Sequence, residues 1–246
     1  MVLVVCLAVG LGLPWWGQER TAGQYPVSAQ DLADGRAALE GLEVAPRGVR
    51  EGYSRAQFGQ AWADTDGNGC DTRNDVLARD LSDVVTRDGC VVLRGTLDDP
   101  YTGDQVAFVR GVHSADVQVD HVVALSDAWR KGADQWDPAR RLAFANDLAN
   151  LQATSAQANQ DKGSSDASAW LPQPGYQCVY VLVQVRVKAA YGLSVTRAEK
   201  SAMSKVLRGC RTVSSPEGAR PPTHQRPVWA TRQRTNASGG RRCQWR

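Results

Sequence analysis

The chain has 246 residues, of which 42% are hydrophobic and 22% charged, and its formal net charge at pH 7 is +3. This length allows one sizeable core with tails, and the charged fraction argues against a disordered chain. So small a net charge excludes a strong overall electrostatic attraction to nucleic acid, while a weak basic excess permits a polyanionic substrate.

The N-terminal residues 1–17, MVLVVCLAVGLGLPWWG, form an apolar run that ends at Pro14. The run is too short to span a bilayer comfortably and is typical of the apolar region of a secretory signal. No basic residue precedes it and no A-x-A cleavage site follows it, so we expect a signal peptide or an uncleaved N-terminal anchor. The protein is therefore predicted to be secreted or extracellular, with a membrane contact only through an uncleaved leader.

Residues 18–45 are polar and rich in Ala and Gly, and we interpret them as a linker that could contain a short helix at 31–42. The folded domain is predicted to cover residues 46–212. Residues 213–246 are rich in Pro, Gly, Ser and Arg, which is typical of a disordered basic tail.

Five cysteines lie beyond the leader: Cys70, Cys90, Cys178, Cys210 and Cys243. None forms a C-x-x-C pair, which argues against a zinc knuckle. In an exported chain, widely spaced cysteines indicate disulfides, and four of them allow three connectivities. We favour Cys70–Cys90 and Cys178–Cys210, because each closes a local segment, and this leaves Cys243 unpaired.

The loop DTDGNGCDTRND at 64–75 is close to the calcium-binding pattern of an EF-hand, in which alternate oxygens surround one cation. A structural Ca²⁺ would take Asp64, Asp66, Asn68 and Asp75 as ligands. Against this, Asp71 stands where an EF-hand has an apolar residue, Asp75 is shorter than the usual glutamate, and no second loop is present. The favoured interpretation is a turn rich in Asn and Gly that supports the domain.

The predicted elements follow in chain order. Helical spacing occurs at 54–62 and 75–85, and 90–111 alternates and turns like a β-hairpin with DDPYTGD at its bend. A strand is predicted at 117–125, helices at 126–133 and 137–148, and an extended piece that becomes helical at 150–163. Residues 178–193 are apolar and fit either a strand or a buried helix. Residues 196–210 form an amphipathic helix with Thr196 as N-cap and Glu199 completing a capping box. This mixture predicts an α+β fold.

Three short motifs carry the chemistry: DH at 120–121, NL at 150–151 and NQDKG at 159–163. A strand that ends in Asp-His, a second strand and a helix with an oxygen ligand can place their side chains around one cation. Asp120 and Asn159 would supply hard oxygen ligands for one Mg²⁺ or Mn²⁺. His121 would face the substrate phosphate as a general base, since the ordinary pKa of histidine suits removal of a proton from water.

At these residues the chain resembles the HNH endonucleases of the ββα-metal (His-Me finger) superfamily. VDHVVALSDAW followed by ANLQATSAQANQDKGSSD is similar to the family's series D-H, N-L-Q and N-x-x-K-G, with Asn159 where many members have His. FGQAWADTDGNGCDTRNDVL through DPYTG to KAAYGLSV is similar to a group of exported bacterial HNH proteins, so the resemblance covers roughly residues 50–210. It implies an α+β fold with a ββα-metal core embedded among helices, braced by disulfides in place of the zinc-binding cysteine pairs of many members.

The resemblance also implies an activity, that of a metal-dependent endonuclease acting on nucleic acid, DNA in preference to RNA, with no stable protein partner. Asp120 and Asn159 would hold the metal, and His121 would activate water. Asn150 would orient the His121 ring or brace the loop, and the products would carry 3′-hydroxyl and 5′-phosphate ends. Lys162 is predicted to contact a neighbouring phosphate, or else to be a solvated charge. Arg73 would face substrate or brace the site.

Several alternatives remain open at this stage. Asn146 could take the bracing role, and His113 is the rival base. Four basic residues between the motifs fit either phosphate contact or a solvated helix face: Arg130, Lys131, Arg140 and Arg141. The whole chain could also be a non-catalytic extracellular module, binding nucleic acid or acting through calcium at 64–75. Intact Asp120, His121 and Asn159 favour the enzyme.

Overall fold

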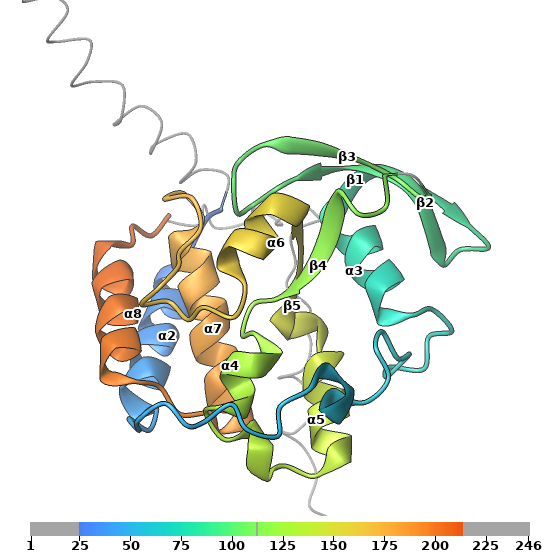
Figure 1. Cartoon of the computed structure of the whole chain (residues 1–246). Coiled ribbons are helices and arrows are strands. Elements are labelled where there is room, and N and C mark those ends of the chain that lie inside the picture. Colours follow the sequence, from blue (N-terminus) through green and yellow to red (C-terminus); the bar gives the residue numbers. More distant parts are fainter. Residues whose placement is uncertain (1–24, 112, 214–246) are drawn as a thin grey trace, which may run out of the picture.

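The computed structural model describes residues 25–111 and 113–213, which contain seven α-helices, three short 3-10 helices and five strands. A three-stranded sheet lies at one side of the molecule and a group of three helices at the other, with a pair of strands and a short helix between them (Figure 1). The predicted α+β class is confirmed. The predicted leader, Cys243 and nearly all of the predicted tail lie outside the described residues.

The outer sheet is antiparallel, and its strands are β1 (Leu81–Arg87), β2 (Val91–Asp98) and β3 (Gln105–Val109), in that order. Strands β2 and β3 pair up to Asp98↔Gln105, which confirms the predicted hairpin. The Cys70–Cys90 disulfide ties the loop before helix α3 (Thr72–Asp80) to the β1–β2 turn, with 5.2 Å between the Cα atoms.

Two predicted helices are shorter in the structure than the sequence indicated. The helix expected over 75–85 ends at Asp80, and β1 begins at the next residue. Pairing with β2 decides the conformation there, and local helical spacing carries no information about such a distant partner. The helix expected over 54–62 is a single turn, η1 (Arg55–Phe58), because Gly59 follows with φ of 78°, which is favourable only for glycine.

The middle of the molecule consists of strand β4 (Val117–His121), strand β5 (Leu151–Ser155) and helix α6 (Ala156–Lys162). Ser155 starts α6, because its side chain accepts the backbone N–H of Ala158. The chain between β4 and β5 forms two helices, α4 (Leu125–Trp129) and α5 (Pro138–Ala145), and two 3-10 turns, η2 (Ala133–Gln135) and η3 (Leu148–Asn150).

The helical side consists of α2 (Ala29–Gly41), α7 (Gln177–Tyr191) and α8 (Arg197–Gly209) (Figure 1). The ambiguous run at 178–193 is helical, and α8 carries the predicted capping box of Thr196 and Glu199. The Cys178–Cys210 disulfide joins the start of α7 to the end of α8, so both favoured pairings are confirmed.

The linker predicted at 18–45 is wrong for the part that the structure describes. Leu32 and Leu39 of α2 are buried in the largest apolar cluster, against α7 and α8. The sequence predicted a linker because α2 is polar on most of its surface, and only a narrow apolar face reaches the core.

Three apolar clusters fill the described fold. One lies among α2, α7 and α8, one around α4 and α5, and one between the outer sheet and the β4–β5 pair. No helix in residues 25–111 and 113–213 is long and apolar enough to cross a bilayer.

Candidate active site

The three sequence motifs meet in one strand-strand-helix unit. Strand β4 pairs antiparallel with β5 along its whole length, and α6 follows β5 directly. Because successive side chains of a strand point to opposite faces, Asp120 and His121 lie on different faces of β4. Helix α6 covers the face that carries Asp120, where Asn159 Nδ2 donates to Gln118 Oε1 at 2.8 Å.

Asp120 is buried in a pair with Lys162. The Lys162 ammonium donates to Asp120 Oδ1 and to the His121 carbonyl, both at 2.9 Å, and the Tyr101 hydroxyl donates to Asp120 Oδ2 at 2.8 Å. Burial is the largest influence on Asp120 and raises its carboxyl pKa, against the opposing effects of Lys162 and Tyr101. Lys162 is 1% exposed, so the structure does not bring it to the surface where a phosphate could reach it.

His121 is held as a neutral imidazole of one tautomer. Its Nε2 lies 2.8 Å from the Ala145 carbonyl, and because a carbonyl only accepts, Nε2 carries the proton. Among the described residues Nδ1 has no hydrogen-bond partner, so its lone pair is available. Burial lowers the pKa of His121 to about 4. The Trp62 ring lies nearly parallel to the imidazole, at 14° with 6.2 Å between centroids.

A cavity of about 230 Å³ opens beside His121. Its walls come from η1 and the residues after it, from α4 and from the end of α5, and are mostly apolar. Among the residues that line it are Arg55, Phe58, Trp62, His121, Leu125 and Asn146. The predicted base therefore lines a hollow in which a small molecule or part of a polymer could bind.

Asn150 braces the chain directly after His121. It is fully buried, its Oδ1 accepts the Val123 N–H at 2.8 Å, and its Nδ2 donates to the Val123 carbonyl at 3.2 Å. Its own carbonyl accepts the Val122 N–H at 2.8 Å. The hydrogen bonds of Asn150 thus go to the loop, and the hydrogen bond of the imidazole ring goes to Ala145.

The two alternatives raised for the base and its brace lie in different surroundings. His113 is exposed, with Nδ1 3.0 Å from Asp116 Oδ2, and does not line the cavity. Asn146 lines it and is buried; its Nδ2 donates to the carbonyls of Gln60 and Leu142. Its Oδ1 has no hydrogen-bond partner among the described residues.

Arg73 holds the chain that leads into β4. It donates to the carbonyls of Ser114 and Val117 at 3.2 and 3.3 Å and lies over the Phe108 ring. These contacts correspond to the bracing role that the sequence left open for it.

The 64–75 loop is a closed turn in this structure. Asp64 accepts backbone N–H groups of residues 67–69, and Asn68 donates from its amide to Asp75 Oδ1 at 3.1 Å and to Asp66 Oδ2 at 3.3 Å. Asp71 caps α3. Donors of the protein itself therefore occupy the oxygens that a calcium ion would need, as in the turn interpretation.

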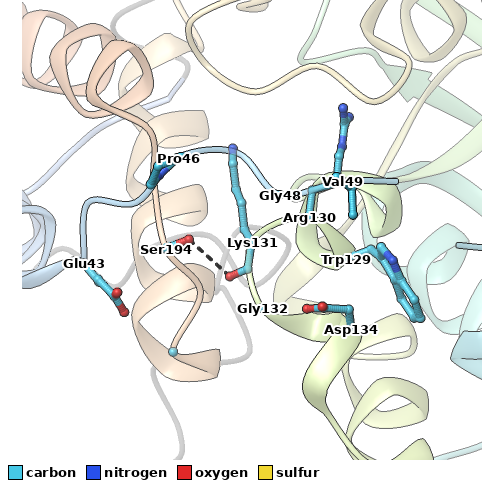
Figure 2. A pocket seen from close by; sticks show the side chains of 11 residues that line it. Glu43, Pro46, Gly48, Val49, Trp129, Arg130, Lys131, Gly132, Asp134 and Ser194 are labelled. Carbon is cyan, nitrogen blue, oxygen red and sulfur yellow. Dashed lines mark hydrogen bonds between the residues drawn. The ribbon is translucent and has the colours of Figure 1, made fainter. Parts of the chain in front are cut away.

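The four basic residues between the motifs are largely used within the fold. Arg141 is buried and donates to the carbonyls of Gln57, Ala133 and Trp136, and Arg140 donates to the Tyr191 carbonyl. Arg130 and Lys131 line a second cavity of about 290 Å³ with Glu43, Asp134 and Ser194 (Figure 2). There Ser194 Oγ donates to the Lys131 carbonyl at 3.4 Å, while the Lys131 ammonium is buried among carboxylates.

The fit of a divalent cation can be judged from the oxygen donors. Carboxylate and amide oxygens are the type that Mg²⁺ and Mn²⁺ take. In this structure, however, both Asp120 oxygens accept hydrogen bonds, from Lys162 and Tyr101, while Asn159 uses only its Nδ2, which donates to Gln118. No three His, Cys, Asp or Glu side chains of residues 25–111 and 113–213 are grouped as metal ligands. As placed, these residues do not fit the cation.

Sequence reasoning missed two residues of the cavity, Arg55 and Trp62. Arg55 lies in a segment predicted only as a helix, and Trp62 lies in a stretch quoted for the resemblance without a role of its own, about sixty residues before His121. The order of motifs carries no signal for such a contact, because tertiary packing alone brings η1 against α5.

A family model described as the C-terminal domain of GmrSD restriction endonucleases matches residues 71–206 of the chain. A protein of Arthroderma benhamiae (strain ATCC MYA-4681 / CBS 112371), named as an uncharacterized secreted protein, is 38% identical over 188 residues, which is 75% of this chain and 89% of the relative. No solved structure matches.

Proposed function

Because the chain belongs to the family of GmrSD restriction endonuclease C-terminal domains, we propose that it is an exported HNH endonuclease that hydrolyses phosphodiester bonds of nucleic acid, DNA in preference to RNA. The observation that supports this most is the state of His121. It ends the first strand of a strand-strand-helix unit, lines a cavity and keeps Nδ1 unprotonated.

In the proposed reaction His121 is the general base. Its Nδ1 takes a proton from water as the water oxygen attacks the phosphorus, and the Ala145 carbonyl stabilises the imidazolium that forms. The bond from phosphorus to the 3′ oxygen breaks, and the leaving oxygen takes a proton from solvent. Asn150 fixes the loop behind the ring, so the base is held in one orientation before substrate binds. The resemblance to HNH enzymes implies 3′-hydroxyl and 5′-phosphate products.

Dependence on one Mg²⁺ or Mn²⁺ is a prediction of the same resemblance, with Asp120 and Asn159 as its ligands. For these residues to bind a cation, the Lys162 ammonium has to leave Asp120 Oδ1, since two cations compete for one carboxylate. Titration of the protein with Mn²⁺, with and without Lys162→Met, measures this competition directly.

Export of the chain is supported by the secreted relative and by two disulfides, which persist in oxidising compartments.

Cleavage of supercoiled plasmid by the full chain tests the proposal. Parallel reactions contain EDTA, Mg²⁺, Mn²⁺ or Ca²⁺, and His121→Ala is compared with the matched control His113→Ala. We expect cutting that needs Mg²⁺ or Mn²⁺, is lost in His121→Ala and is retained in His113→Ala. Cutting that survives in His121→Ala removes the base from this site. A folded protein that cuts no plasmid, single-stranded DNA or RNA, yet binds them, is the non-catalytic module instead.

A further inference from the structure

The cavity beside His121 has walls that suit a flat ring better than a charged phosphate. Phe58, Trp62 and Leu125 make most of its lining apolar, and its volume of about 230 Å³ exceeds the ~10–15 Å³ that one water needs. The free energy needed to remove water from a phosphate there would exceed the stabilisation that the few polar groups of the cavity can provide. A nucleobase is flat, largely apolar on its faces and polar at its edge.

Trp62 offers such a base a stacking surface. The residue is half-buried, and it packs against the apolar cluster below the β4–β5 pair. Its backbone has φ of 58°, a left-handed conformation that is uncommon for a bulky residue and is kept where the surroundings enforce it. Aromatic side chains held in this way are the usual platforms for unpaired bases.

Asn146 adds an acceptor oxygen that no described residue donates to. Its Nδ2 is used by the carbonyls of Gln60 and Leu142, while its Oδ1 is buried and accepts no hydrogen bond from any described residue. Asn146 lines the cavity, and buried polar atoms are nearly always satisfied, so a donor on a bound ligand would satisfy this oxygen. Every nucleobase has an N–H donor on its Watson–Crick edge, and that edge is free only when the base is unpaired.

Arg55 places a positive charge at the same cavity. Its side chain is exposed, and it lines the same cavity as His121. An arginine there can bind the phosphate attached to a nucleotide whose base enters the cavity. This phosphate would then lie next to His121.

We propose that this cavity is a subsite for one unpaired nucleobase, which stacks on Trp62 and donates a hydrogen bond from its edge to Asn146 Oδ1. The enzyme then prefers single-stranded or locally unpaired nucleic acid. The inference rests on the proposed function for its substrate, and it adds the strand form that the active site selects.

Binding measured without turnover tests it. The full chain carrying His121→Ala is titrated into a fluorescent single-stranded oligonucleotide and into the same sequence as a duplex, at one salt concentration. We expect tighter binding of the single strand. Trp62→Leu, which keeps apolar volume without the ring, should weaken single-strand binding roughly 5- to 100-fold, and Trp62→Phe should restore most of it. Trp170→Leu is the matched control, since this tryptophan is partly buried and does not line the cavity.

Equal affinity for both strand forms, or Trp62→Leu and Trp62→Phe binding alike, overturns the subsite. Plasmid cutting that depends on His121 would then still support the proposed nuclease. If nothing is cut but Trp62→Leu still loses single-strand binding, the enzyme assignment fails and the base subsite stands.

Discussion

Replacing Lys188 by methionine removes one charge from a buried ion cluster that we define as Lys131, Lys188, Asp127, Asp166 and Glu199. All five side chains are at most 2% exposed. Lys188 Nζ lies 3.1 Å from Asp127 Oδ2 and 3.0 Å from Glu199 Oε1, the second contact being an ion pair without hydrogen-bond geometry. The cluster joins α4, α7, α8 and the chain after α6.

The expected loss of stability in Lys188→Met follows from the charge balance of the cluster. With Arg47, which reaches Asp127 and Asp166, three cations face three carboxylates. Burial disfavours the charged form of Lys188, but Asp127 and Glu199 outweigh it and raise the pKa, so the ammonium stays charged. Lys188→Met leaves one buried carboxylate uncompensated, which costs about 3–5 kcal/mol. For a domain of this size that lowers Tm by roughly 6–20 °C.

The assay is urea unfolding at pH 7 with both disulfides oxidised. The control is Lys200→Met. Its ammonium lies 3.8 Å from the mostly exposed Glu40 carboxylate and also donates to the carbonyls of Glu40 and Leu42, so we expect a loss of only about 1 kcal/mol in unfolding free energy. The double variant Lys188→Met with Glu199→Gln restores neutrality and should recover part of the loss. If the unfolding free energies of Lys188→Met and Lys200→Met differ by less than about 1 kcal/mol, the cluster does not act as a balanced network of charges.

Three further predictions concern the site, a disulfide and acid. Asn150→Ala leaves the backbone N–H and carbonyl of Val123 without their side-chain partners, so we expect a loss of about 1–3 kcal/mol in unfolding free energy, together with reduced cleavage by the folded fraction. Replacing Cys178 and Cys210 by serine opens a segment of 32 residues and should cost about 3–4 kcal/mol in unfolding free energy, measured by denaturant unfolding against the wild type with both disulfides oxidised. Burial favours protonation of Asp127, but the two neighbouring ammonium groups outweigh it and hold its pKa below its usual value. Its contribution is therefore present above the unfolded pKa of about 3.9 and is lost as pH falls through the folded value, which an acid titration of stability will show as a steeper fall than in Lys188→Met.

Local signals were sufficient where neighbouring residues decide the structure. The β-rich run at 117–125 and the extended piece that becomes helical at 150–163 predict the strands and the helix of the central unit, and all are present. The capping box of Thr196 and Glu199 was predictable because its two hydrogen bonds join residues three positions apart. The hairpin at 90–111 formed as expected because its bend lies between strands that pair with each other.

Local signals failed where a distant partner decides the structure. Strand β1 exists because β2 pairs with it, and α2 is ordered because α7 and α8 bury Leu32 and Leu39. The run at 178–193 is apolar enough for either secondary structure, and burial on several sides as α7 determines the helix.

The amino-acid sequence was enough to predict the motifs, their order and the family, and it favoured two disulfide pairs among three connectivities. The contacts of each side chain depend on the tertiary structure. Alternation along β4 sends Asp120 to α6, where Lys162 neutralises it, and sends His121 to the other face, where the Ala145 carbonyl fixes its tautomer. Arg55 and Trp62 join His121 through packing across about sixty residues of chain, and no spacing in the sequence encodes a contact formed by burial.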